Sequence, residues 1–443
     1  MAKLKIPKRV STGLINALGT GVVPKVGIEH VAVGREKETA ALLQDLDNIA
    51  EGGGAFRFIV GRYGSGKSFM LQLIRNHAME RDFVVADADL SPERRLAGTN
   101  RQGVATYRQL MQNLSTKIRP EGGALPPILE RWIAGIQTQV AQDSGMNPKD
   151  EGFDDRVESR IREVVEGIEG LVHGFDFANV IISYWRGYRL DDSDKKDAAL
   201  RWLRGEFATK TEAKSALGDR VSIIDDDSWY DYIKLLAKFV SDIGYKGLLV
   251  LLDEAVHLFK ITHAASRQSN YDKLLAMFND TMQGGVENLG IFLGGTPQFL
   301  EDKRRGLYSD EAWRTRLAKS RFVREGIQDT SGAAIQLDPL TSQELTELLK
   351  RLSDVHATHF NYEKTLKAKD FQEFMQEITS RLGADKLATP REVVRDFISV
   401  LNILRENPTI SLSELIHGSD FKLTSASKDS DVDADGELAE FTL

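Results

Sequence analysis

Residues 56–72, FRFIVGRYGSGKSFMLQ, restrict the fold of this chain more than any other stretch. An apolar run stops at Gly61, and Gly61, Gly66, Lys67 and Ser68 then fit the spacing G-x-x-x-x-G-K-[ST] at every fixed position before helix-forming residues resume. Strand, glycine-rich turn and helix in this order predict a phosphate-binding loop (P-loop). The alternative, a glycine-rich turn that binds no ligand, requires all of these features to agree by accident.

The residue types of this loop explain its expected chemistry. Successive N–H groups, from Gly64 and Ser65 through Phe69, are expected to face a phosphate chain at the start of a helix, where the helix dipole also favours negative charge. Lys67 is expected to reach the β and γ phosphates, and Ser68 to hold Mg²⁺. The sequence therefore predicts ATP and Mg²⁺ as ligands.

A second element follows much later in the chain. Residues 247–252 form an apolar run, as in a parallel strand that is buried on both faces, and the run ends in Asp253 and Glu254. Open α/β sheets place their ligands at the carboxyl ends of such strands. We therefore expect Asp253 to bind in the Mg²⁺ shell and Glu254 to orient and polarise the attacking water. Alternatively, the two acids begin a helix with Asp253 as its cap.

Other polar residues also follow apolar runs. Residues 289–296 read as a strand that ends in Thr296, whose hydroxyl is expected either to contact the γ-phosphate or the water, or to cap the next turn. Residues 83–86 read as another strand, which closes with Asp87 and Asp89. These two acids are expected to enter the site or to serve the structure, as acids at strand ends commonly do.

The order of the elements predicts an α/β fold of the P-loop NTPase type, with a parallel sheet, a large helical insertion and a helical lid. Lys67 and Asp253 are separated by far more than the roughly 30 residues of a βαβ step, so most of the intervening chain must be inserted. The expected parts are an N-terminal segment (1–28), a P-loop ATPase core (29–96 and 244–338), the insertion (97–243), the lid (339–423) and a disordered acidic tail (424–443).

Apolar periodicity places the remaining elements. The insertion is expected to contain helices over residues 107–118, 128–140, 157–172, 177–188, 195–202 and 229–243. Outside it we expect a strand or extended piece at 31–33, helices at 11–18, 40–49 and 271–282, and a last strand at 333–337.

Composition limits the class of protein. The 443 residues include no cysteine, which excludes disulfides and thiolate metal sites. No apolar run approaches the roughly 18–20 residues needed to span a bilayer, and the basic start is not followed by an apolar signal core. We therefore expect a cytoplasmic protein without membrane contact.

The charge is distributed unevenly. The net charge of −8 argues against a protein that coats nucleic acid, but residues 303–324 carry eight basic side chains against two acids. Residues 428–443 carry six acids against one lysine. The basic stretch is expected either to contact DNA phosphates or to present arginines to the nucleotide of a neighbouring subunit.

The sequence of motifs resembles an AAA+ ATPase with its lid. The lid region contains Thr389-Pro390-Arg391, and by this resemblance Arg391 matches the sensor 2 arginine and Thr296 matches sensor 1. The resemblance also implies an arginine finger, which reaches the ATP of a neighbour. Its candidates are Arg314, Arg316 and Arg321, which alternatively form a solvated basic face or salt bridges.

The segment 33–36 resembles the piece that cradles adenine in origin-recognition-type members, which assigns Gly34 and Arg35 to the nucleotide. More closely, the chain is similar to the P-loop ATP-binding proteins of BREX-type bacterial phage-defence systems. Long blocks carry this similarity: residues 23–38, 58–73, 87–96, 248–259 and 294–317. The resemblance implies an ATPase that works beside a helicase or a methyltransferase on DNA.

Two functions of different classes remain open at this point. One is a homo-oligomeric ATPase that hydrolyses ATP at subunit interfaces and uses the motion on DNA or on a DNA-bound partner. The other is a nucleotide-gated scaffold or switch, in which bound ATP orders an assembly and hydrolysis resets it. The two predict opposite results for Glu254→Gln, since a motor loses function whereas a switch keeps partner binding.

Overall fold

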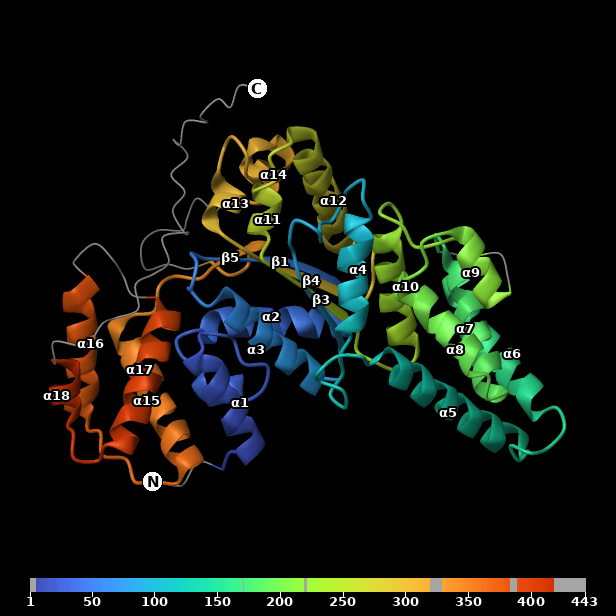
Figure 1. The fold of residues 1–443 in the computed structure, drawn as a ribbon. Coiled ribbons are helices and arrows are strands. Elements are labelled where there is room, and N and C mark those ends of the chain that lie inside the picture. The colour runs from blue at the N-terminus through green and yellow to red at the C-terminus, as the bar shows by residue number, and fades with distance from the viewer. Residues whose placement is uncertain (1–4, 170, 219–220, 319–328, 383–388, 418–443) are drawn as a thin grey trace, which may run out of the picture. The chain divides into compact units, whose positions relative to one another are not determined.

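The computed structural model describes residues 5–169, 171–218, 221–318, 329–382 and 389–417 (Figure 1). The chain forms two compact units. Unit 1 comprises Met1–Glu36, Gly61–Gln72 and Leu337–Leu443, and unit 2 comprises Lys37–Val60 and Leu73–Gln336. The acidic tail at 424–443 lies outside the described residues.

Unit 2 contains a five-stranded sheet in the order β2-β3-β4-β1-β5, and its strand pairs are all parallel. The strands are β1 (Gly54–Val60), β2 (Val84–Asp89), β3 (Leu248–Asp253), β4 (Leu289–Gly295) and β5 (Ala334–Gln336). Every residue of β4 and all but the last of β3 are buried. Burial on both faces explains why these two strands read as continuous apolar runs, and the predicted parallel α/β fold is confirmed.

Helices pack on the sheet, and the inserted segment consists mainly of helices. The helices of unit 2 are α2 (Glu36–Ala50), the end of α3 (Lys67–Glu80), α4 (Gln102–Gln112), α5 (Leu125–Ser144), α6 (Phe153–Glu169), α7 (Gly174–Arg189), α8 (Ser193–Leu203), α9 (Lys210–Leu217), α10 (Trp229–Asp242), α11 (Val256–Phe259), α12 (Ala264–Met282), α13 (Pro297–Glu301), η2 (Leu307–Ser309) and α14 (Glu311–Arg316).

Alternation along β1 sends its side chains to two different layers. Phe56 packs on Phe278 of α12, with ring centroids 5.3 Å apart. Arg57 points to the other face, where its Nε donates to Asp45 Oδ2 of α2 at 2.6 Å. Figure 1 shows α2 and α12 on the two sides of the sheet, which is the layered arrangement of an α/β domain.

The insertion shares its hydrophobic core with the sheet. Buried residues of α4–α10 and of β1–β4 belong to one apolar cluster. At its junction with the strands, Trp229 Nε1 donates to Leu96 O at 3.0 Å, and Asn270 of α12 holds the same stretch through Leu96 N at 2.9 Å. The insertion is thus packed into the body of unit 2.

Two local expectations are refined by the structure, and one helix is additional to them. Residues Ile28–Val31 form a 3₁₀ helix (η1), so 31–33 is not a strand, whereas Ala32 has the extended backbone of the alternative. The helix expected over 107–118 ends at Gln112, because Ser115 pairs with Val85 in an antiparallel bridge at the start of β2. Helix α9 is not predicted from periodicity, since eight residues give little more than two turns of pattern.

The described residues of unit 1 form helices joined by loops, and the P-loop is one of these loops. The helices of unit 1 are α1 (Lys8–Gly19), η1, the start of α3, α15 (Ser342–Phe360), α16 (Ala368–Leu382), α17 (Pro390–Glu406) and α18 (Leu412–Ile416). Their apolar faces meet in one core, in which Phe374 and Phe397 lie 5.1 Å apart between ring centroids. Leu14 of α1 and Phe69 of α3 pack into the same core, so α1 and the start of α3 belong to unit 1 together with the C-terminal helices.

Within the described ranges, no helix combines the length and the apolar character that crossing a membrane requires.

Candidate nucleotide-binding site

The P-loop begins directly after β1 and leads into α3. Gly64 and Gly66 have φ values of +76° and +98°, in the left-handed region that favours glycine. A Cβ on Gly64 would also lie 2.8 Å from the Cβ of Thr389, at the start of α17. The loop after Gly61 therefore has the backbone form that the motif predicts, and it lies against the lid within unit 1.

Polar groups of the loop are arranged around its turn. Lys67 Nζ donates to Arg62 O at 3.0 Å, which bends the side chain back over the loop. Ser65 Oγ is buried and has no hydrogen-bond partner among the residues that the structure describes. Ser68 is half-buried in the first turn of α3, and Phe69 packs against the lid core. A buried hydroxyl without a partner is what a site for a polar ligand would contain.

The Arg35 side chain is hydrogen-bonded to the backbone of the P-loop. It is almost fully buried, and Nη2 donates to Ser65 O at 3.2 Å and to Asp338 O at 2.7 Å. Gly34, at φ +68°, precedes it and lies against Glu344 of α15. The Arg35 guanidinium thus bridges the P-loop and the segment that precedes α15. The contact of Gly34 and Arg35 with the base stays a prediction.

Arg391, in the first turn of α17, lies on the P-loop. Its Nη1 donates to the hydroxyl of Tyr63 at 2.8 Å, and its Cζ lies 4.9 Å from the centroid of the Tyr63 ring. The sequence motif leaves Tyr63 undefined, because only the glycines, the lysine and the serine have fixed positions. The residue is therefore one that sequence reasoning missed, although an aromatic side chain inside a phosphate-binding loop is a signal that could have singled it out.

Unit 2 supplies the strand ends at the carboxyl edge of the sheet. Asp253 Oδ1 accepts from Glu254 N at 2.7 Å. Helix α11 starts at Val256 with Ala255 as its N-cap residue, so Asp253 is not the cap of that helix. Glu254 has φ +57°, which is uncommon for a residue with a side chain and costs about 1–3 kcal/mol. Such strain gathers at functional sites.

Thr296 follows β4, the strand between β1 and β3. Its Oγ1 accepts from Phe299 N at 3.3 Å and caps α13. Thr296 therefore has the capping role, which is one of the two roles expected from the sequence. A contact between this hydroxyl and a γ-phosphate stays a prediction.

The two acids of β2 differ in their surroundings. Asp87 forms an ion pair with Arg75 Nε at 3.0 Å, and the Arg75 side chain is almost fully buried on α3. Asn113 Nδ2 also donates to the Asp87 carboxylate at 3.2 Å. The Asp87 carboxylate therefore has a structural role, because it joins β2 to α3 and to the end of α4. Asp89 is exposed and pairs in register with Asp253 across the parallel strands.

The candidate finger arginines have different environments. Trp313 is fully buried and anchors α14. Arg316 Nε donates to Asn279 Oδ1 at 3.0 Å, whereas the exposed Arg314 side chain has no hydrogen-bond or ion-pair partner within the described part of the chain. Arg321 lies outside the described residues. Of the two described candidates, Arg316 is therefore engaged within its own chain, and a finger role for any of the three stays a prediction.

One titratable group lies close to Glu254 in the sequence. Burial lowers the pKa of His257 below its ordinary value, and the positive charges of Lys260 and Arg94 act in the same direction. The lowered pKa favours the neutral form of this imidazole beside the strand end.

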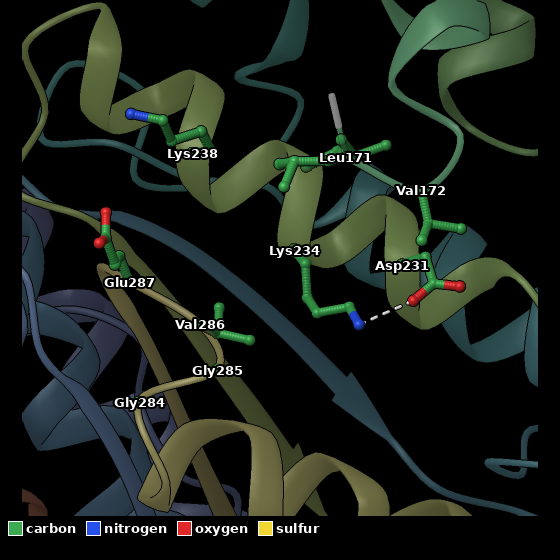
Figure 2. A pocket seen from close by; sticks show the side chains of 10 residues that line it. Leu171, Val172, Asp231, Lys234, Lys238, Gly284, Gly285, Val286 and Glu287 are labelled. Carbon is green, nitrogen blue, oxygen red and sulfur yellow. Dashed lines mark ion pairs between the residues drawn. The ribbon is translucent and has the colours of Figure 1, made fainter. Parts of the chain in front are cut away.

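A separate cavity of about 340 Å³ lies in unit 2, where α10 faces the turn between α12 and β4 (Figure 2). Leu171 and Val172 line it together with Lys234, Lys238 and the turn at 284–287. Lys234 is paired with Asp231 at 2.8 Å. None of the residues predicted to bind nucleotide lines this cavity.

A parallel sheet, a P-loop between its strand β1 and helix α3, and an acidic pair at the end of β3 define a P-loop NTPase-like protein. A comparison with curated protein sequences found no match. A family model, described as BREX system ATP-binding protein BrxC/D, matches residues 6–420. The chain belongs to this family, as its resemblance to the ATP-binding proteins of phage-defence systems predicted.

Proposed function

We propose that this protein binds ATP with Mg²⁺ at the P-loop and hydrolyses it as part of anti-phage defence. The complete G-x-x-x-x-G-K-[ST] loop between β1 and α3, in a chain of an ATP-binding family, carries the proposal. The loop N–H groups and Lys67 would bind the phosphates, and Ser68 and Asp253 would hold the metal. Bound Mg²⁺ would neutralise part of the phosphate charge.

Glu254 is the proposed general base. It directly follows the proposed metal ligand Asp253, and its left-handed backbone turns the chain sharply where β3 ends. Hydrogen bonds hold this turn, since Ala255 N donates to Gly294 O and His257 N to Glu254 O, both at 3.0 Å. A fixed carboxylate at this point can accept the proton of the attacking water.

The assembly and partners belong to the same proposal. We expect a homo-oligomer of the AAA+ type, in which a finger arginine from α14 of one subunit completes the site of the next. Such a finger adds about 10³–10⁵ in rate. The protein would act on DNA, or beside it with a helicase or methyltransferase.

ATP hydrolysis by the purified protein tests the proposal. Turnover should rise steeply with protein concentration, increase with double-stranded DNA and fall by about 10² or more in Glu254→Gln. Lys67→Ala should abolish ATP binding, because the lysine is the group expected to reach the β and γ phosphates. Turnover by Glu254→Gln equal to that of the unchanged protein would contradict the assignment of the base.

A nucleotide-gated switch is the second candidate. The contact between Gly64 of the P-loop and Thr389 of α17 favours it, because a change in the loop would reach the lid directly. In a switch, Glu254→Gln would bind ATP and retain its partner, and DNA would leave the turnover unchanged. Pull-down of partners with Glu254→Gln in the presence of ATP separates the two candidates.

A further inference from the structure

The Arg391 guanidinium is held by Tyr63 of the P-loop. It lies on the ring of Tyr63, 4.9 Å from the centroid, and donates to the hydroxyl at 2.8 Å. The head of this arginine is thus held by a residue of the P-loop that is distant from it in the sequence.

The backbone that carries Arg391 is also fixed. Thr389 is the N-cap of α17 and forms a capping box with Glu392, and Pro390 occupies the first helical position. Thr389 in turn abuts Gly64 of the P-loop. Two neighbouring loop residues, Tyr63 and Gly64, therefore meet the N-cap residue and the second helical residue of α17.

Tyr63 contributes little to the core, because its relative exposure is 56%. A solvated aromatic ring gains little from burial, so packing does not account for an aromatic residue here. Stacking on the ring and the charge-assisted hydrogen bond to its hydroxyl together define where the guanidinium lies. The ring is therefore suited to orient a cation.

We infer that Tyr63 is a positioning residue that holds Arg391 beside the phosphate loop, and that the pair discriminates ATP from ADP. The inference rests on the proposed ATP site and deepens it. A guanidinium fixed beside the loop attracts the charge of a third phosphate, and ADP lacks that phosphate. Without the ring, the arginine loses this fixed orientation and the discrimination falls.

Equilibrium binding of AMP-PNP and of ADP to the full-length protein tests this. Tyr63→Ala should weaken AMP-PNP binding about five- to tenfold and change ADP binding less than about twofold. Tyr63→Phe keeps the ring and should weaken AMP-PNP binding less than about threefold. In an Arg391→Ala background, Tyr63→Ala should have no further effect on AMP-PNP, since the two residues act as one unit.

Arg395→Ala is the matched control, because Arg395 lies one turn further along α17 and has no hydrogen bond or ring contact with Tyr63 among the described residues. It should bind both nucleotides as the unchanged protein does. If Tyr63→Ala weakens ADP and AMP-PNP equally, or adds its full effect to that of Arg391→Ala, the inference is wrong while the ATP site stands. If the unchanged protein binds neither nucleotide, the proposed function fails and the inference fails with it.

Discussion

Replacement of Gly64 by alanine measures how closely the P-loop and α17 approach each other. The left-handed backbone at φ +76° costs an L-residue about 1–2 kcal/mol. The new methyl would lie 2.8 Å from the Cβ of Thr389, whereas non-bonded carbons prefer about 3.5–4.0 Å. Overpacking of this kind adds about 1–3 kcal/mol, so we expect Gly64→Ala to lower the free energy of unfolding by about 2–5 kcal/mol.

Gly21 provides a matched control in the same unit. Its φ is +75°, and a Cβ there would make only ordinary contacts, the nearest at 3.6 Å. Gly21→Ala should therefore show the backbone cost of about 1–2 kcal/mol without the overpacking. Urea unfolding of the full-length variants, followed by circular dichroism, measures both values.

A third variant isolates the contact. In a Thr389→Gly background the opposing Cβ is absent, so the cost of Gly64→Ala should fall to that of Gly21→Ala. The loss of the helix cap is common to both members of this comparison and cancels. Equal destabilisation by Gly64→Ala and Gly21→Ala in the unchanged background would refute the close approach of loop and lid.

Two further predictions concern other parts of the chain. Arg314→Ala should lower ATP turnover at high protein concentration by about 10³ or more, whereas Arg316→Ala should lower it less than tenfold, because Arg316 is already engaged with Asn279. The reverse order in the ATPase assay would assign the finger to Arg316. Burial lowers the pKa of His356 below its ordinary value of about 6.5, so the unfolded chain takes up its proton first and stability is lost as pH falls below that value. Urea unfolding at pH 7 and pH 5 should show a larger loss for the unchanged protein than for His356→Gln; an equal loss would count against this group.

The local parts of the site follow from the sequence because they are short-range patterns. The P-loop is one strand, one turn and one helix in sequence, and the strand that ends in Asp253 is recognisable because burial on both faces removes every polar side chain from it. Parallel strands place their carboxyl ends at one edge, so Asp253 and Thr296 could be expected there without knowing the strand order.

The order of the strands and the long-range contacts do not follow from such patterns. The position of β4 between β1 and β3 depends on packing between segments that are hundreds of residues apart. The contact of Tyr63 with Arg391 joins residues 328 positions apart. Hydrophobic periodicity relates residues within one helix or strand, so it cannot predict a pair of this kind. Arg35 is a second example. Its sequence context predicts a contact with a ligand, whereas its hydrogen bonds to two backbone carbonyl groups could be found only from the structure.

The common core of insertion and sheet determines how unit 2 can come apart. Because α10 packs on β3 and Trp229 bonds to the chain beyond β2, unfolding of α10 would remove contacts that β2 and β3 depend on. Removing the insertion would expose buried faces of β2 and β3 to water, and the remainder would aggregate. Unit 2 should therefore lose its structure in one cooperative step, and a partner that stabilised the insertion would raise the stability of the strand that carries Asp253 by the same free energy.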